Sequence, residues 1–161
     1  NTYGGPMGRE GAWGFVAGLR FSLAEDEALA VTISRGAASY TGFQVVDPWT
    51  LASDARTNLT SLNLAQSAPD KDGNFTYVIA PRDPGVANWL DTTGQPEGYM
   101  AIRWAYPVKP MDKLPWATAK KVPLAELRQH LPADTRLISP DERRQQIAIR
   151  QEHVQRRYRQ H

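Results

Sequence analysis

Alternation of apolar and polar residues with a period of two is the feature that most constrains how this chain can fold. It is clearest in three segments, residues 28–34, 75–80 and 99–104. In the first of these, Leu29, Val31 and Ile33 share one face, and smaller or polar residues lie between them. Because successive side chains of a strand point to opposite sides of a sheet, the pattern predicts strands with one buried face. Clusters of Gly, Pro and Asp separate the segments, as is typical of turns.

Weaker alternation predicts further strands over residues 13–23, 40–46 and 117–122. The expected fold is therefore mainly β: an antiparallel β-sandwich, jelly-roll-like, with a short helix over 123–131 and a basic C-terminal helix. A chain of 161 residues is expected to bury one sizeable core. The predicted core residues are Phe15, Phe21, Leu29, Val31, Ile33, Phe43, Val45, Tyr77, Ile79 and Ile102.

Three parts of the chain are expected from these patterns. Residues 1–12 are Gly-rich without periodicity and are interpreted as an N-terminal arm or the remnant of a preceding segment, followed by the sandwich over 13–138. The C-terminal helix over 139–161 has a clear start, with Ser139 as N-cap, Pro140 at the first helical position and Glu142 completing a capping box. Its apolar stripe is thin, so it is expected either to pack by one edge or to reach another subunit.

The charge distribution excludes a broad basic surface on the sandwich. The net charge is +2, but the segment from Asp141 onward carries +3, which leaves −1 for the rest of the chain. Nucleic-acid binding is therefore not expected, because it needs a clustered basic face on the folded body. The chain has no cysteine and no apolar run long enough to span a bilayer, which is compatible with a cytoplasmic or a bacterial periplasmic location.

The long connection over residues 81–98 is the place where sequence reasoning expects any site. Long loops inside compact domains tend to be functional, and this one carries Trp89 between Asn88 and a nearby Asp91. The favoured interpretation is a structural plug, with Trp89 buried and Asp91 bonded to backbone amides or to an arginine, above all Arg103.

A ligand cleft, if present, is expected beside that loop, with Tyr40, Gln44 and Trp104 as the opposite wall. The predicted ligand-binding residues are Tyr40, Gln44, Trp89, Asp91, Arg103 and Trp104. Aromatic side chains suit stacking on a ring or a sugar face, and a guanidinium suits a carboxylate.

Few residues offer catalytic or metal chemistry. The three histidines, His130, His153 and His161, have no ligand spacing, and neither a metal nor a cofactor is expected. No phosphate-binding glycine motif and no serine-nucleophile motif occurs. The alternative that stays open is acid–base catalysis by Asp83 or Asp91, with Arg82 or Arg103 holding an anion.

One family resemblance rests on three runs: TSLNLAQ, DKDGNFTYVIAPRDPGVANWLDTTG and GYMAIRW. They resemble the bacterial family called domain of unknown function 1214, which usually follows a domain of unknown function 1254. The resemblance covers roughly residues 13–131. It implies a jelly-roll sandwich with helical additions that forms the C-terminal part of a longer protein, and it carries no reaction or catalytic residue.

Two function classes follow. The first is a binding or interaction module with an aromatic-rimmed cleft, whose partners would be a small molecule, a partner domain or a second copy of the chain. The second is a cofactor-independent enzyme that acts on a small or carbohydrate-like substrate through loop carboxylates and arginines.

Overall fold

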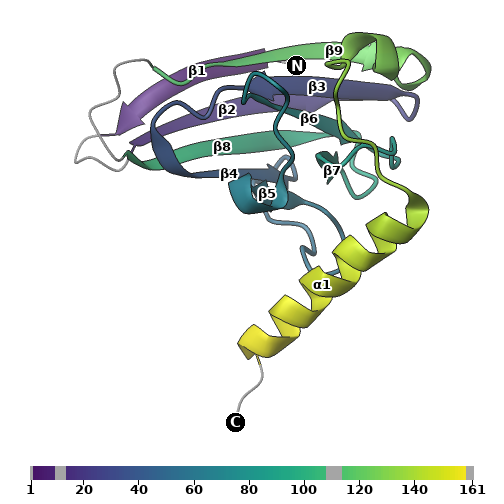
Figure 1. Cartoon of the computed structure of the whole chain (residues 1–161). Coiled ribbons are helices and arrows are strands. Elements are labelled where there is room, and N and C mark those ends of the chain that lie inside the picture. Colours follow the sequence, from purple (N-terminus) through teal and green to yellow (C-terminus); the bar gives the residue numbers. More distant parts are fainter. Residues whose placement is uncertain (1, 10–13, 108–113, 159–161) are drawn as a thin grey trace.

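Two β-sheets packed face to face, with a long helix at the C-terminal end, make up the computed structural model, which describes residues 2–9, 14–107 and 114–158 (Figure 1). The first sheet is antiparallel and has the strand order β1 (Thr2–Arg9), β2 (Gly14–Ser22), β8 (Glu97–Pro107), β4 (Ala38–Val46) and β5 (Ser61–Asn63). The second has the order β7 (Trp89–Asp91), β6 (Phe75–Ala80), β3 (Glu27–Ile33) and β9 (Ala117–Pro123), with β7 parallel to β6. The predicted mainly β sandwich is confirmed.

The main core lies between the two sheets. All ten predicted core residues belong to it; nine are buried, and Phe15 is half-buried against the others. Phe43 of β4 stacks on Tyr77 of β6 with ring centroids 3.8 Å apart, which joins the two sheets at their centre. Burial and the apolar surroundings raise the pKa of the Tyr77 hydroxyl, which donates to Ser67 Oγ at 2.8 Å.

A second apolar cluster covers the outer face of the second sheet. Side chains of the sheet pack there against residues of the surrounding loops and of the segments 124–131 and 140–158. The buried members are Ala28, Leu59, Val78, Ala80, Val86, Trp89, Val122 and Leu127, and Leu124, Leu131 and Ile147 are partly buried against them. The outer face of the first sheet has no such cover within the described residues, since Gly18, Arg20, Gln44, Ala101 and Arg103 are exposed there. The two sheets therefore differ in what lies over them.

Two predictions need correction, and the segment between β4 and β6 adds two short elements. Residues 2–9 do not form an arm but the edge strand β1, because backbone pairing with β2 needs no side-chain alternation. The loop over 81–98 contains the short strand β7, and the segment before β6 contains β5 followed by a 3-10 turn, η1 (Leu64–Gln66). Residues 10–12 of the expected arm and Trp13 lie outside the described residues.

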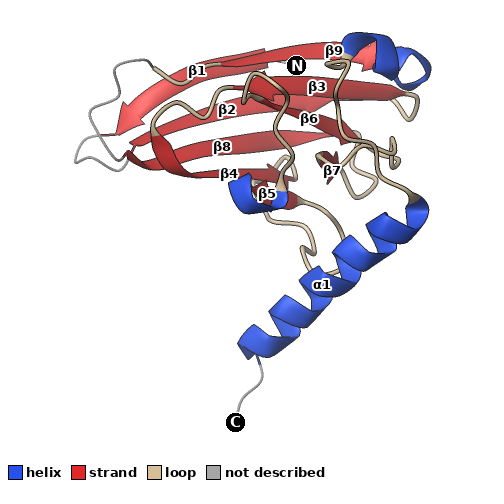
Figure 2. Ribbon diagram, in the orientation of Figure 1, coloured by secondary structure: helices blue, strands red, loops and turns tan. Residues whose placement is uncertain are grey.

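Both predicted helices are present, but the shorter one is a 3-10 helix and not an α-helix. The short one, η2 (Leu124–His130), is a 3-10 helix that buries Leu127, and Pro123 precedes it as N-cap. The long one, α1 (Pro140–Tyr158), begins with the predicted capping box: Glu142 N–H donates to Ser139 Oγ, and Ser139 N–H donates to a Glu142 carboxylate oxygen. Figure 2 shows α1 below the two sheets with its C-terminal end extending away from them, and Arg150, near the middle of the helix, donates to Ser61 of β5.

Truncation of a core residue tests the assignment of faces. Ile79 is fully buried in the main core, so Ile79→Ala is expected to lower the free energy of unfolding by about 2–5 kcal/mol. The exposed Thr118 of β9 serves as the control, and Thr118→Ala is expected to change it by less than about 1 kcal/mol. Urea denaturation monitored by fluorescence measures both. Equal losses would mean that the sandwich interior is placed wrongly.

Candidate functional site

The loop over residues 81–98 lies along the edge of the second sheet, where it contributes the strand β7. Trp89 has only 8% of its surface exposed, and its indole Nε1 donates to Ala80 O at 3.0 Å. The guanidinium of Arg143, from α1, lies over the indole ring at 5.1 Å from the ring centroid. The expected burial of Trp89 is confirmed, and its side chain lies on the outer face of the second sheet.

Arg143 is the polar anchor between α1 and this loop. It is 5% exposed and donates through Nε and Nη2 to both carboxylate oxygens of Asp83, at 2.9 and 3.1 Å. Nη2 also donates to Val86 O, and Nη1 to Gln146 Oε1. A two-pronged guanidinium–carboxylate pair of this kind is both directional and strong. The N-terminal half of α1 thus packs against the body by one edge, as one of the two alternatives predicted.

Asp91 bonds within its own turn. Its Oδ1 accepts from Thr93 N–H at 2.7 Å, which is the backbone bond predicted for it. The expected pairing with Arg103 is wrong, because Arg103 lies on the exposed face of the other sheet. Partial burial raises the pKa of the Asp91 carboxyl, the Thr93 amide opposes this shift, and the charge of Asp83 adds to it.

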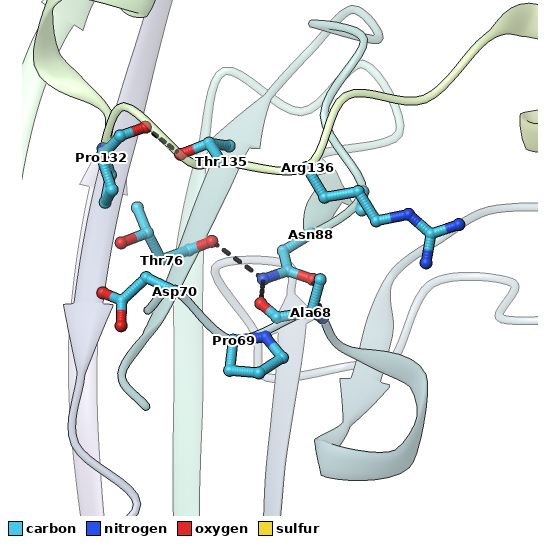
Figure 3. Close-up of a pocket in the computed structure, with 9 residues that line it drawn as sticks. Ala68, Pro69, Asp70, Thr76, Asn88, Pro132, Thr135 and Arg136 are labelled. Carbon is cyan, nitrogen blue, oxygen red and sulfur yellow. Dashed lines mark hydrogen bonds between the residues drawn. The ribbon is translucent and has the colours of Figure 1, made fainter. Parts of the chain in front are cut away.

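A crevice next to the loop is too small for a ligand (Figure 3). Figure 3 shows Asn88 at its centre, where Nδ2 donates to Ala68 O and Thr76 O, and Oδ1 accepts from Ala68 N–H. Its accessible volume is about 10 Å³, the space of roughly one water molecule. Asn88 therefore ties the segment before β6 to the loop, and the crevice is a structural feature.

A larger hollow lies on the exposed face of the first sheet, over β4, β5 and β8. The strand register explains it: Gly42 of β4 pairs with Arg103 of β8 on one side and with Asn63 of β5 on the other. Gln44 pairs with Ala101 in the next outward row. Small residues at the middle of this grid and long ones around it leave a depression. Its volume is about 220 Å³.

This hollow, called the amide hollow below, has a distinctive lining. Its residues are Tyr40, Gly42, Phe43, Gln44, Ser61, Leu62, Asn63, Gln66, Ala101 and Arg103. Arg103 supplies a cation with no hydrogen-bond or ion-pair partner among the described residues. The described lining residues include no Asp, Glu or His. The site therefore offers an uncompensated positive charge among neutral polar groups.

The 3-10 turn η1 orients two of the lining amides. Asn63 Oδ1 accepts from Gln66 N–H and Gln66 Oε1 accepts from Asn63 N–H, each at 3.1 Å, which completes a capping box. With both carbonyl oxygens engaged, the two amide NH₂ groups have no partner within the described part of the chain. Asn63 and Gln66, both of which line the hollow, thus have amide donors that are not used within the described part of the chain.

Tyr40 covers part of the hollow floor. A Cβ added to Gly42 would lie 2.6 Å from Tyr40 Oη and 3.0 Å from its Cε1 and Cζ atoms, so the ring rests on this glycine. Tyr40 and Gln44 are the two diagonal neighbours of Arg103 on β4, about 7–8 Å away between Cα atoms. Tyr40 as a whole is 44% exposed.

The structure thus brings together three of the six predicted site residues, Tyr40, Gln44 and Arg103, in one hollow. It does not bring the other three there. Trp104 faces the main core, is 1% exposed, and donates from Nε1 to Ser34 O at 2.8 Å. Trp89 and Asp91 belong to the second sheet. Asn63 and Gln66 were missed, although their spacing of three residues is a capping-box signal.

The acid–base arrangement considered from the sequence is not assembled. Asp83 and Asp91 lie near enough for one charge to affect the pKa of the other, but Asp83 is occupied by Arg143. Arg82 pairs with the exposed Glu25 at 2.7 Å, and Arg103 lies on the other sheet.

Within residues 2–9, 14–107 and 114–158, no group of three or more His, Asp or Glu side chains is placed to bind a metal ion. No helix in the same ranges has the length and apolarity required to span a membrane.

Comparison with known proteins supports the architecture. No protein-family model and no curated protein matches the chain. A crystal structure of an uncharacterized protein from Burkholderia cenocepacia matches 69% of the chain with 29% sequence identity and a TM-score of 0.63. The VPA0106 protein from Vibrio parahaemolyticus matches 65% of it with 12% identity and a TM-score of 0.46. The chain spans 30% of the length of each of these proteins.

The raised pKa of Asp91 predicts a pH dependence of stability. Between the ordinary pKa of 3.8 and the raised one, the folded protein binds more protons at this carboxyl than the unfolded chain does. The stabilising contribution of Asp91 is therefore complete below its ordinary pKa and is lost as pH rises through the raised value. Asp91→Asn, which keeps the acceptor for Thr93, is expected to remove this decline.

Urea titrations of the wild type and Asp91→Asn across the acid range measure that difference. Asp72→Asn is the matched control, because Asp72 is exposed and its carboxylate makes no bond among the described residues. Parallel pH profiles for wild type and Asp91→Asn would show that burial does not perturb this carboxyl.

The Arg143 anchor predicts a large difference between two adjacent arginines. Arg143→Met leaves Asp83 and the Val86 carbonyl without their partner and is expected to cost about 2–4 kcal/mol of unfolding free energy. Arg144→Met removes an exposed pair with Asp141 and is expected to cost less than about 1 kcal/mol. Chemical denaturation compares them, and equal losses would contradict the anchoring role.

Proposed function

We propose that this chain is a ligand-binding β-sandwich module of the domain of unknown function 1214 family, and that the amide hollow is its binding site. The family proposal rests on the NWLDTTG-containing run and its flanking motifs. The likeness to the Burkholderia cenocepacia protein supports the fold and offers no activity to transfer. The binding proposal rests on the hollow itself.

The observation that carries the proposal is the guanidinium of Arg103, which has no partner among the described residues and shares the hollow with neutral polar groups. Three amide side chains and a phenol surround it, and no carboxylate lies among the described lining residues. A guanidinium in such a setting favours a carboxylate, which accepts two parallel hydrogen bonds. The ligand class is therefore a small carboxylate.

The remaining lining groups favour a hydroxylated ligand. Amide groups and the Tyr40 hydroxyl can each bond a sugar hydroxyl, and the Tyr40 ring can stack on the apolar face of a pyranose. A volume of about 220 Å³ lies below the range of drug-sized pockets, about 300–1,000 Å³, and suits one ring. We therefore select a sugar acid as the ligand type.

Binding is favoured over catalysis for a reason specific to this hollow. Acid–base chemistry needs a group that exchanges protons near the working pH, within hydrogen-bond reach of the ligand. The described lining residues provide no carboxylate and no imidazole, and Asp83 and Asp91 are not among them. This lining therefore supports ligand binding rather than acid–base catalysis.

Titration with glucuronate, followed by calorimetry, tests the proposal. Arg103→Gln is expected to weaken binding by about three- to tenfold, because an ion pair at an exposed guanidinium contributes about 1 kcal/mol. Arg82→Gln is the matched control, since Arg82 carries the same charge and pairs with Glu25 outside the hollow. Its affinity is expected to equal that of the wild type.

Glucose, which lacks the carboxylate, is expected to bind more weakly than glucuronate. Equal affinities for the two sugars, or an unchanged affinity in Arg103→Gln, would exclude the amide hollow as a carboxylate site.

A further inference from the structure

A second hollow adjoins the amide hollow on the same sheet. Its volume is about 260 Å³, and it lies over the ends of β2, β4 and β8. Its lining residues are Gly14, Phe15, Val16, Tyr40, Arg103, Trp104, Ala105 and Tyr106. Tyr40 and Arg103 line both hollows, so these two side chains stand at the boundary between them.

The strand register places this second hollow beside Arg103. Val16 of β2 pairs directly with Arg103, and Ala105 of β8 pairs with Tyr40 of β4. Cross-strand partners project to the same face of a sheet, so Val16 and Ala105 share the exposed face with Arg103. The two hollows therefore lie next to each other along β8, from Ala101 to Ala105, with Tyr40 and Arg103 between them.

The lining of the second hollow is chemically different. Apart from Arg103 and the hydroxyls of Tyr40 and Tyr106, its side chains are apolar or absent, and it contains no amide side chain. The amide hollow, in contrast, contains Gln44, Asn63 and Gln66. We call the second one the apolar hollow. Together the two volumes fall within the usual range of ligand pockets, about 300–1,000 Å³.

From this juxtaposition we infer that the ligand is an amphipathic carboxylate that fills both hollows. Its carboxylate binds Arg103 at the boundary, its hydroxylated ring occupies the amide hollow, and an aromatic or alkyl substituent occupies the apolar hollow. The inference rests on the proposed function and adds the substituent to the ligand class. Aryl glycosides of sugar acids have this chemistry.

Two probes that differ only in the substituent test the inference. Phenyl glucuronide is expected to bind the wild type about tenfold more tightly than methyl glucuronide, because the phenyl ring removes more apolar surface from water.

Two matched substitutions on β8 separate the hollows. Ala101 lines the amide hollow and Ala105 the apolar hollow, and both are outward-facing residues of one strand. Ala105→Leu is expected to abolish the advantage of the phenyl compound and to leave methyl glucuronide binding within about twofold of wild type. Ala101→Leu is expected to weaken both ligands by about tenfold or more.

The outcomes separate this inference from the proposed function. If wild type binds both glucuronides equally and Ala105→Leu changes neither affinity, the role of the apolar hollow is refuted while the amide hollow stands. If neither glucuronide binds the wild type, the proposed function fails and the inference fails with it. Circular dichroism confirms that both leucine variants are folded.

Discussion

The alternation of inward- and outward-facing residues along β8 is the constraint on which the rest of the structure depends. Met100, Ile102 and Trp104 point into the main core, and the residues between them point to solvent. A shift of the pairing by one residue would bring the Arg103 guanidinium into the sandwich and expel Trp104. Burying an unpaired guanidinium is strongly unfavourable, so the core and the amide hollow fix the register together. Alternate residues of β8 thus form the core on one face of the sheet and line the amide hollow on the other.

The second sheet uses the rest of the chain differently. Its outer face is covered by η2, the loop over 81–98 and the first half of α1, which together form the second apolar cluster. Arg143 makes this cover specific, since its bonds to Asp83 and Val86 orient the helix and its stacking contact covers Trp89. The sequence made this loop a candidate site because it has a tryptophan beside polar residues. In the structure these residues instead hold the loop and α1 against the outer face of the second sheet.

Sequence periodicity predicted the strands whose faces differ in polarity, and it failed where side chains give no signal. β1 was missed because its glycines have no faces to distinguish, and β7 because three residues cannot show a period. The pairing of β4 with β8, which creates the amide hollow, is long-range and is not encoded in either strand alone. The predicted wall of Tyr40, Gln44 and Trp104 depended on that pairing, which places Tyr40 opposite Ala105 and Trp104 opposite Thr41, so that Trp104 faces the core while Tyr40 and Gln44 face outward.

The exposed position of Arg103 also limits what the charge can contribute. An ion pair at an open surface is typically worth about 0–1 kcal/mol and is weakened by salt, because water and ions screen it. The proposed selectivity for a sugar acid therefore depends on several bonds made together: the paired hydrogen bonds of the guanidinium, bonds to the lining amides, and contact with the Tyr40 ring. Gly42 is central to that arrangement, because any side chain there would displace the ring that rests on it. The contact with the Tyr40 ring, rather than packing in the core, thus accounts for a glycine at this outward-facing position of β4.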